Sequence, residues 1–554
     1  MIKSKPKEMI PMKNSFKKAV SVFLTAILLF TFAFSGTAAV VKDTSKELKT
    51  YSVGDKLLWN TLDVIVDGLL KGIAAMVPPL SKWTDSYGAK GFMEGTADFI
   101  SQKSENAKWL LGYDSRSILL PHDEILGKMY VAGTIGVKEK FATEIVDDLF
   151  VRTVALSDNS GRGTAVFACI DSYGLSLSDV RELRTSLEAY AKENNINSIT
   201  LSVLHQHSAV DTFGMNGNIW EMVFTNPAKN IFGMNTVNGK DEKYMDNLFR
   251  KCTESIKAAT EGMTEGRLFE GEADAGKYIY DKRQPYVMDE SFTRLRFVPE
   301  NGGKETWIVT TAIHCVGNGA AGTAVTGDYP YYMEQEIKDT ANLMVVLGAE
   351  LGTTQNNTSK TNPEYDSAKT DFELIAGYGR AIAKDILAIS DETEIEPIFN
   401  IRYKEMYVPV ENPILLFAAK CGAFDNIVRR NGLKYNLLTE IGYMELGENL
   451  AFAIVPGELA PELAYGGTLS GDVAWSGKNW EYPSMEEIVK TNRGENKKLL
   501  VLGLANDQIG YIVPDNDYMP MIHEDSKSLE FVSLGKNTAS KLVTEFGALV
   551  AGLN

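Results

Sequence analysis

The sequence predicts an α/β fold of mixed β-sheets flanked by helices, with a metal site at the carboxyl ends of strands. Apolar, β-branched runs alternate along the chain with amphipathic patterns such as SLSDVRELRTSLEAYAKENN and PYYMEQEIKDTANL, an order typical of α/β proteins. Several of the apolar runs also end in polar residues. Because ligands bind outside the carboxyl ends of strands in α/β sheets, these ends are expected to gather around one site.

Six strand ends carry the polar residues or segments that are candidates for this site. In chain order they are Asp171 after GTAVFACI, His205 and His207 after SITLSVL, His314 after TWIVTTAI, GTTQNNTS after LMVVLGAEL, Glu458 after LAFAIVPG, and Tyr511 beyond KLLVLGLAND. Neutral imidazole together with carboxylate is a typical ligand set for zinc. No short metal motif such as HExxH occurs in the chain, so the site has to be assembled from distant segments.

The stretch SVLHQHSAVDT places two of the five histidines of the chain two residues apart. Ile199, Leu201 and Val203 alternate with more polar residues, as in a strand. If the alternation continues, His205 and His207 lie on the same face as these apolar residues. Such a pair can bind one metal ion, or one imidazole can bind metal while the other donates a proton. The alternative is a core histidine beside a surface one. His122 and His523 lie in polar contexts and are interpreted as surface histidines.

The N-terminus has the pattern of a targeting segment. Six lysines within the first 18 residues precede the apolar run AVSVFLTAILLFTFAF, and the small residues SGTAA follow it. Cleavage after Ala38 or Ala39 fits a signal peptide; an uncleaved membrane anchor is the alternative, since apolar residues continue to Val41. Either way we expect the protein to be secreted or extracytoplasmic, with membrane anchoring by this segment as the second option.

Composition and charge restrict the class of partner. The chain is globular in composition, with 44% hydrophobic and 23% charged residues, and removal of the first 38 residues takes the formal charge from −17 to −22. An acidic protein of this kind is poorly suited to bind phosphate backbones or anionic lipid surfaces, so no nucleic-acid partner is expected. The four cysteines have no CxxC spacing. The sequence is compatible with one or two disulfides. It is equally compatible with buried free thiols at Cys169 and Cys315, which lie in apolar runs.

Residues 57–79 form an amphipathic helical pattern. The apolar face carries Leu58, Leu62, Ile65, Leu69, Ile73 and Met76, and the other face carries Asn60, Asp63, Asp67 and Lys71. A helix at a lipid interface and a helix packed on the protein core are both compatible with this pattern. Interfacial helices are usually basic on their polar face, whereas this one has two aspartates and one lysine, which favours packing on the core. The expected organisation is a signal segment over 1–39, a helical segment packed on the core over 40–120, and a hydrolase domain over 121–554.

From about residue 125 to 550, an ordered series of motifs resembles the neutral/alkaline, non-lysosomal ceramidase family, which are zinc-dependent amidases. DDLFVRTVALSD with GTAVFACIDSYGL looks like the family's opening strands, SVLHQHSAV is similar to its HTHSGP motif, and DKRQPY to its NRSP motif. TTAIHCVGNG with TGDYPYYMEQE, VPGELAPE and GLANDQIGYIVPDNDY resemble its later zinc-histidine, PGE and LANxYxGY segments.

The resemblance implies a set of site residues. It implies one zinc ion per chain, with His205, His314, Glu458 and Tyr511 as ligands. It also implies that His207 and Arg283 contact the substrate or the developing oxyanion. In the expected mechanism His207, Tyr511 or Arg283 stabilises the charge on the carbonyl oxygen.

The chain departs from the family pattern in three places. The family's GDxSPN segment, with an acidic residue and a serine proposed as nucleophile, reads GTTQNN over residues 352–357, and the glycine-rich tail after the histidine pair becomes SAVD over 208–211. We expect no C-terminal β-sandwich domain behind the catalytic region. Zinc-bound water therefore replaces a protein nucleophile in the expected mechanism, because GTTQNNTS offers no base to activate Thr353 or Thr354.

These observations predict an exported zinc-dependent amidohydrolase that hydrolyses the N-acyl amide bond of ceramide or a related lipid amide by metal-activated water. The expected partner is a small lipid-amide substrate, with peripheral or anchored membrane contact. Two alternatives remain: another metal-dependent hydrolase on the same scaffold, acting on an ester, a cell-wall amide or a phosphate, and a catalytically inactive exported metal-binding protein.

Overall fold

The computed structural model describes residues 48–84, 87–88, 90–133, 139–232, 234–319, 322–526 and 529–553. The signal segment predicted for residues 1–39 lies outside these ranges. Within them, no helix is long and apolar enough to cross a membrane. The four cysteines are all buried and free. Of the two alternatives, disulfides and buried free thiols, the structure therefore contains the free thiols.

The larger of two main sheets has nine strands within the described residues, in the order β11-β9-β8-β6-β1-β3-β4-β5, with β13 paired to β6. Its outer pairs β9–β11 and β4–β5 are parallel and its inner pairs are antiparallel. The strands are β1 (Trp109–Ser117), β3 (Phe150–Ser157), β4 (Thr164–Ile170), β5 (Ile196–Val203), β6 (Thr264–Asp274), β8 (Ser291–Pro299), β9 (Glu305–Thr311), β11 (Ala341–Leu347) and β13 (Glu392–Ile395). The sheet is therefore mixed, as predicted.

A second sheet of five strands in the described part of the chain has the order β14-β16-β17-β19, with β15 paired to β16. Its strands are β14 (Phe399–Pro409), β15 (Val428–Asn431), β16 (Lys434–Leu446), β17 (Leu450–Ile454) and β19 (Lys498–Leu502). Short pairs complete the strand set: β2 (Glu144–Ile145) with β10 (Ala324–Val325), β7 (Ile279–Asp281) with β12 (Thr353–Gln355), and β18 (Glu458–Leu459) with β20 (Tyr511–Ile512).

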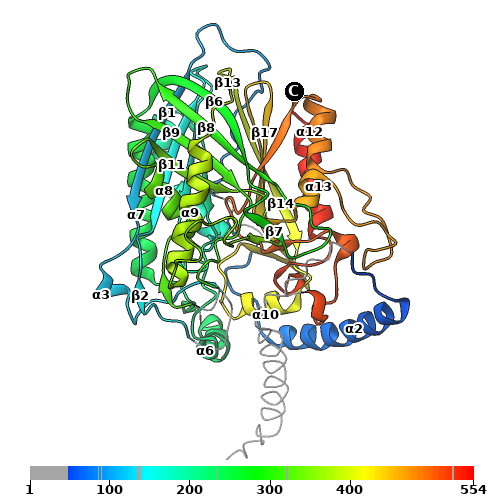
Figure 1. Cartoon of the computed structure of the whole chain (residues 1–554). Coiled ribbons are helices and arrows are strands. Elements are labelled where there is room, and N and C mark those ends of the chain that lie inside the picture. The colour runs from blue at the N-terminus through cyan, green and yellow to red at the C-terminus, as the bar shows by residue number, and fades with distance from the viewer. Residues whose placement is uncertain are drawn as a thin grey trace, which may run out of the picture.

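Helices cover the sheets on their outer sides (Figure 1). α7 packs on β1 and β3, α8 on β11, α9 on β6, and α12 and α13 on the smaller sheet. The helices are α2 (Val53–Met76), α3 (His122–Ile125), α4 (Leu177–Ser186), α5 (Glu188–Glu193), α6 (Ile219–Ile231), α7 (Glu242–Glu261), α8 (Asp328–Ile337), α9 (Asp371–Leu387), α10 (Pro413–Lys420), α11 (Pro461–Tyr465), α12 (Met485–Arg493) and α13 (Thr538–Ala551). The predicted α/β class with flanking helices is confirmed.

The core lies between the two sheets and behind the smaller one. On β17, Phe452 and Ile454 belong to the large apolar cluster that includes β4 and β5, while Ala451 and Ala453 belong to a second cluster with α12 and α13. Alternate residues of one strand thus face opposite layers, as the period of two requires. β17 and β19 are buried along nearly their whole length, which explains why these two strands read as apolar runs, whereas β14 and β15 also carry charged residues that are only partly buried or exposed.

One segment joins the ends of strands from both sheets. After β19, Gly503 N donates to Leu347 O at the end of β11, and Asn506 N donates to Leu201 O in β5 at 2.7 Å. Ser202 and Ala505 form an antiparallel bridge. The carboxyl ends of β5, β11 and β19 therefore meet at one place in the interior.

One sequence-based expectation about the periphery is changed by the structure. His523, interpreted as a surface histidine, is buried among the rings of Tyr51, Trp59 and Trp475, with ring centroids 4.9–5.4 Å from its own. The aromatic residues come from distant segments, so the polar local sequence of His523 carried no sign of them. His122 is exposed, as expected.

Candidate metal centre

The site is built by residues that directly follow strands whose carboxyl ends converge. His205 follows β5 by two residues, His314 follows β9 by three, and Glu350 follows β11 by three. Glu458 begins β18 after β17. These four side chains each place one ligand atom within 4.8 Å of the others, and all four are buried. They form a cluster that can hold a metal ion, hereafter the His/Glu cluster.

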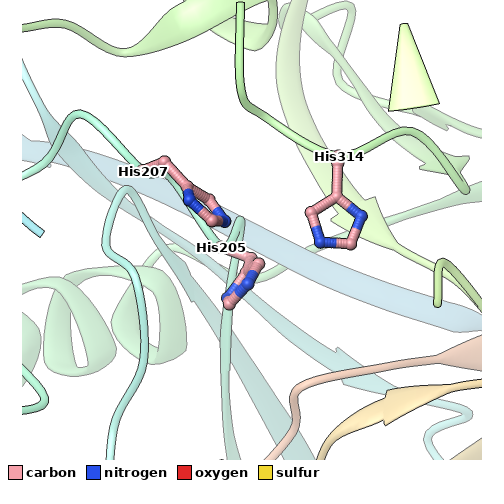
Figure 2. A group of neighbouring side chains, drawn as sticks. All are labelled: His205, His207 and His314. Carbon is pink, nitrogen blue, oxygen red and sulfur yellow. The ribbon is translucent and has the colours of Figure 1, made fainter. Parts of the chain in front are cut away.

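The β5 strand does not continue through the histidine pair. It ends at Val203, and His205 has a φ of 49°, a left-handed conformation that L residues rarely adopt and that costs about 1–3 kcal/mol. The expected strand alternation is therefore replaced by a turn. The turn still brings the two rings together, with the centroids of His205 and His207 4.8 Å apart and the His205 and His314 centroids 5.2 Å apart. Figure 2 shows the three imidazoles facing one another from two different loops.

Backbone carbonyls orient both histidines of the cluster. His205 Nδ1 lies 2.8 Å from Tyr173 O, and His314 Nδ1 lies 3.1 Å from Thr353 O. When such a ring is neutral and its Nδ1–H donates to the carbonyl, its lone pair is on Nε2, where it can bind a metal ion. Both Nε2 atoms face one carboxylate oxygen, Glu458 Oε2, at 3.4 Å for His205 and 3.0 Å for His314. This orientation of imidazole by a partner on its second nitrogen is characteristic of metal-ligating histidines.

Glu350 completes the cluster from the other side of His314. Its Oε2 lies 3.3 Å from His314 Nδ1, and its side chain has no exposed surface. Among the described residues, neither Glu350 nor Glu458 has a lysine or arginine ion-pair partner. Two carboxylates are thus buried beside histidines alone.

The protonation states reflect this burial and the two carboxylates. Burial lowers the pKa of His205 to about 4, so its imidazole is neutral at pH 7. Burial also lowers the pKa of His314, but the charges of Glu350 and Glu458 outweigh it and raise the value to about 9. Burial raises the pKa of Glu350 to about 8. Without a metal ion, the cluster has to take up protons to reduce its negative charge. A bound divalent cation would supply the compensating positive charge instead.

Several polar atoms at this place have no hydrogen-bond partner, which tests whether a metal ion fits. His205 Nε2, both ring nitrogens of His207 and both oxygens of Glu350 are buried without one. Buried polar atoms are rarely left unpaired in native structures. Two imidazoles and two carboxylates match the nitrogen and oxygen ligands of zinc. The residues therefore fit a bound metal ion.

Tyr511, the fourth ligand implied by the resemblance, lies beside the cluster. β18 and β20 pair in parallel with Glu458 opposite Tyr511. Burial, followed by the charge of Glu458, raises the pKa of Tyr511 well above its usual range. His207 is half-buried at the edge of the same cluster. The structure thus brings together His205, His207, His314, Glu458 and Tyr511.

Arg283 is near this loop system, but its guanidinium is directed to other carboxylates. It is ion-paired with Glu462 and, at 2.9 Å, with Asp517. Its backbone approaches the GTTQNN segment, since Lys282 N donates to Gly352 O. Asp171, another candidate strand-end residue, pairs with Arg152 at 2.7 Å instead of joining the cluster.

Two residues of the site were missed by sequence reasoning. Glu350 lies in the run LMVVLGAEL, directly before the threonines of GTTQNNTS. An acidic residue at the end of an apolar strand was the available signal. Gln508 donates from Nε2 to Glu458 Oε1 at 3.2 Å and precedes Tyr511 in the same loop. Its role had no separate sequence signal.

The fold and the cluster together define a mixed α/β protein with a buried histidine–glutamate site able to hold a metal ion. This fold is shared with neutral ceramidase, which confirms the resemblance drawn from the motifs. The neutral ceramidase of Pseudomonas aeruginosa superposes with a TM-score of 0.61 at 13% identity, over 81% of this chain and 74% of that one. A structure described as ceramidase complexed with C2 gives a TM-score of 0.58 at 14% identity, over 80% of this chain and 75% of that one.

No protein-family model and no curated protein sequence matches the chain. The chain is therefore a divergent protein with the neutral ceramidase fold. At such low identity the likeness establishes the fold, and the chemistry has to be argued from the side chains.

Proposed function

We propose that the chain is an exported, zinc-dependent amidohydrolase that hydrolyses the N-acyl amide bond of ceramide or a related lipid amide. The observation that carries the proposal is the convergence of His205 Nε2 and His314 Nε2 on one oxygen of Glu458, within a fold shared with neutral ceramidase. His205, His314 and Glu458 would hold the ion, with Tyr511 or Glu350 as the fourth residue. A bound zinc ion supplies Lewis-acid polarisation of a carbonyl and lowers the pKa of bound water from about 15.7 toward about 7.

The residues around the cluster are suited to stabilise the charge that develops on the amide oxygen. Because its pKa is raised, the Tyr511 phenol stays protonated at neutral pH and can donate a hydrogen bond. Burial lowers the pKa of His207 well below its usual value, so this ring is neutral, with one N–H donor. Both of its nitrogens lack partners. A donor aimed at a developing oxyanion contributes about 3–4 kcal/mol to lowering the barrier in comparable sites.

The hydroxyl of Thr353 is poorly placed to be the nucleophile. It lies 2.5 Å from Ala312 O and 2.8 Å from Glu350 O, so its proton is held by backbone carbonyls. These contacts fix the segment from Glu350 to Thr353, whose own carbonyl orients His314. We therefore propose water as the nucleophile: its oxygen forms the new bond to the acyl carbon, the C–N bond breaks, and the amine leaves with the proton.

Arg283 is retained in the proposal as a residue that positions the loops around the cluster. Its ion pair with Glu462 connects the DKRQPY segment to α11. Glu462 lies four residues after Glu458 in the chain. A direct contact of Arg283 with the substrate would require the guanidinium to exchange one of its two carboxylate partners.

The test is a hydrolysis assay on purified, metal-loaded protein with ceramide, a simple N-acyl amide, an ester, a muramyl amide and a phosphate ester. We expect turnover of the lipid amide, its loss in Glu458→Ala, and its retention in His122→Ala, which changes an exposed histidine outside the cluster. Turnover of another substrate class alone would assign a different hydrolase. Metal binding without any turnover would assign a binding protein.

A further inference from the structure

The orientation of α2 is opposite to that of an amphipathic helix packed on a core. Its charged and polar side contacts the protein: Lys56 Nζ donates to Ala474 O at 2.7 Å, and Trp475 Nε1 donates to Asn60 Oδ1 at 2.9 Å. Near its C-terminal end, Lys420 Nζ donates to Ala74 O at 2.8 Å. Polar bonds to the body thus fix which side of the helix faces outward.

The outward side of α2 is mainly apolar, although Asp55 in its first turn and Asn60 and Thr61 are also exposed. Leu57 is 68% exposed and Ile65 is 63% exposed. The large exposed apolar residues are Val53, Leu57, Leu58, Leu62, Val64, Ile65, Leu69 and Met76. Between Lys56 and Lys71 the charged residues are Asp63 and Asp67, and both are on the half-buried side. A continuous apolar strip of this kind on a protein surface marks an interaction site.

A second exposed apolar group lies on α6 and the turn after it. Its members are Trp220, Phe224, Ile231, Phe232 and Met234, and Phe232 is 78% exposed. Asn230 of α6 bonds to Pro79 O and Ser81 N, in the segment that directly follows α2. α10 packs on α2, and Asn226 of α6 donates to Cys421 O at the end of α10. In Figure 1 these three helices lie at the same end of the molecule.

We propose that the outward sides of α2 and α6, hereafter the apolar face, bind the surface of a lipid bilayer. Interfacial helices bury their apolar side about 5–10 Å into the bilayer and place tryptophan near the headgroups, and Trp220 is on this face. The polar side of α2 is not predominantly basic, which at first favours core packing; this composition is explained because Lys56 and Asn60 on that side bond to the protein, so the side is directed away from headgroups.

The course of the chain before α2 indicates a membrane as the occupant. The apolar run over residues 19–34 ends 19 residues before Val53. An extended chain covers at most about 3.6 Å per residue, so the end of this run is at most about 68 Å from the start of α2. Export across or anchoring in a membrane delivers the apolar face to a lipid surface. Since the protein is acidic and the large exposed side chains of the face are apolar, we expect binding to zwitterionic lipid that is insensitive to salt.

This inference extends the proposed function, because a lipid-amide substrate would reach the enzyme from the same surface. It is tested on the full chain with phosphatidylcholine vesicles. The native cysteines are all buried, so Ile65→Cys and Phe232→Cys can each be labelled with a polarity-sensitive fluorophore. Tyr365→Cys, beside α9, is the matched control at an exposed apolar position.

We expect vesicles to shift the emission of both labels on the apolar face to the blue and to leave the control label unchanged, in low and in high salt. Vesicle binding with the Ile65 label still in water would mean that only the N-terminal segment binds lipid. A shift that depends on protein concentration without vesicles would mean that a second copy covers the face. Either result overturns the proposal.

A second measurement separates the apolar face from the proposed activity. The variant Leu58→Ser/Ile65→Ser/Leu69→Ser changes only exposed residues, so it is expected to fold. Its turnover of amide embedded in vesicles should fall at least about tenfold, while turnover of a soluble short-chain amide stays unchanged. Equal turnover of the embedded amide by the variant and the native chain would overturn the inference. If no amide is hydrolysed at all, the proposed function fails, and the fluorophore shifts still decide the inference.

Discussion

His314 and Glu458 are 144 residues apart in the chain, and their side chains meet with Nε2 of His314 3.0 Å from Oε2 of Glu458. The contact joins the loop after β9 to the loop after β17, and so connects the two sheets at the centre of the molecule. His205 Nε2 faces the same oxygen. The following expected outcomes depend on this arrangement.

Replacement of Glu350 tests a residue that only the structure reveals. Glu350→Gln keeps the shape of the side chain but cannot provide a carboxylate ligand beside His314. We expect metal affinity to fall at least about tenfold, the scale observed when partners of ligating residues are changed. Competition with a metal-sensing dye measures the affinity. Glu530→Gln, at another buried glutamate, is the control and should keep native affinity; equal affinities in both variants would remove Glu350 from the site.

The threonines of the GTTQNN segment are expected to be unnecessary for bond cleavage. Thr353→Ala and Thr354→Ala should each slow turnover less than about tenfold, equivalent to about 1.4 kcal/mol in the barrier, whereas Glu458→Ala should lose far more. Thr353→Ala should also be less stable, by about 1–3 kcal/mol, because the buried carbonyl of Ala312 loses its hydroxyl donor, while the Glu350 carbonyl keeps the Thr353 N–H. Steady-state kinetics and denaturant unfolding separate the two effects. An acyl group trapped on either threonine would contradict water as the nucleophile.

Removal of metal is expected to destabilise the fold. A ligand that binds only the folded state at a concentration 1,000 times its Kd adds about 4.1 kcal/mol to the free energy of unfolding. A strong chelator should therefore lower the Tm by several degrees, and added zinc should restore it. The His205→Ala variant should start at the lower Tm and show no change with chelator. A chelator effect of equal size in that variant would place the stabilising metal elsewhere.

The N-terminal segment is expected to be removed during export, since small residues follow an apolar run that is short for a membrane span. N-terminal sequencing of the exported protein should begin at Ala39 or Val40. An intact N-terminus in the membrane fraction would instead support the anchor.

The sequence allowed the fold class and most of the site to be predicted because both depend on local patterns. Apolar periodicity marked the strands, and polar residues directly after them marked His205, His314 and Glu458. Glu350 also follows an apolar strand, but its contact with His314 depends on the pairing of β11 with β9, which places the two residues side by side. Register between distant strands is set by packing and is not written in a short motif.

The orientation of α2 was likewise beyond the local pattern. Amphipathicity divides a helix into two sides but does not say which side meets the protein. Here the choice is made by Trp475 and Ala474, more than 400 residues further along the chain. The burial of His523 has the same origin, since its aromatic neighbours Tyr51 and Trp59 come from the other end of the sequence.

The central claim, that the His/Glu cluster is a zinc site, is tested most directly by the metal content of the purified full chain. Mass spectrometry of the native protein should find one zinc per chain. His205→Ala and His314→Ala should each lose most of it, because each removes one of few ligands. His122→Ala should retain it. Stoichiometric zinc in either cluster variant, or a native protein that takes up no zinc when it is supplied, would contradict the account.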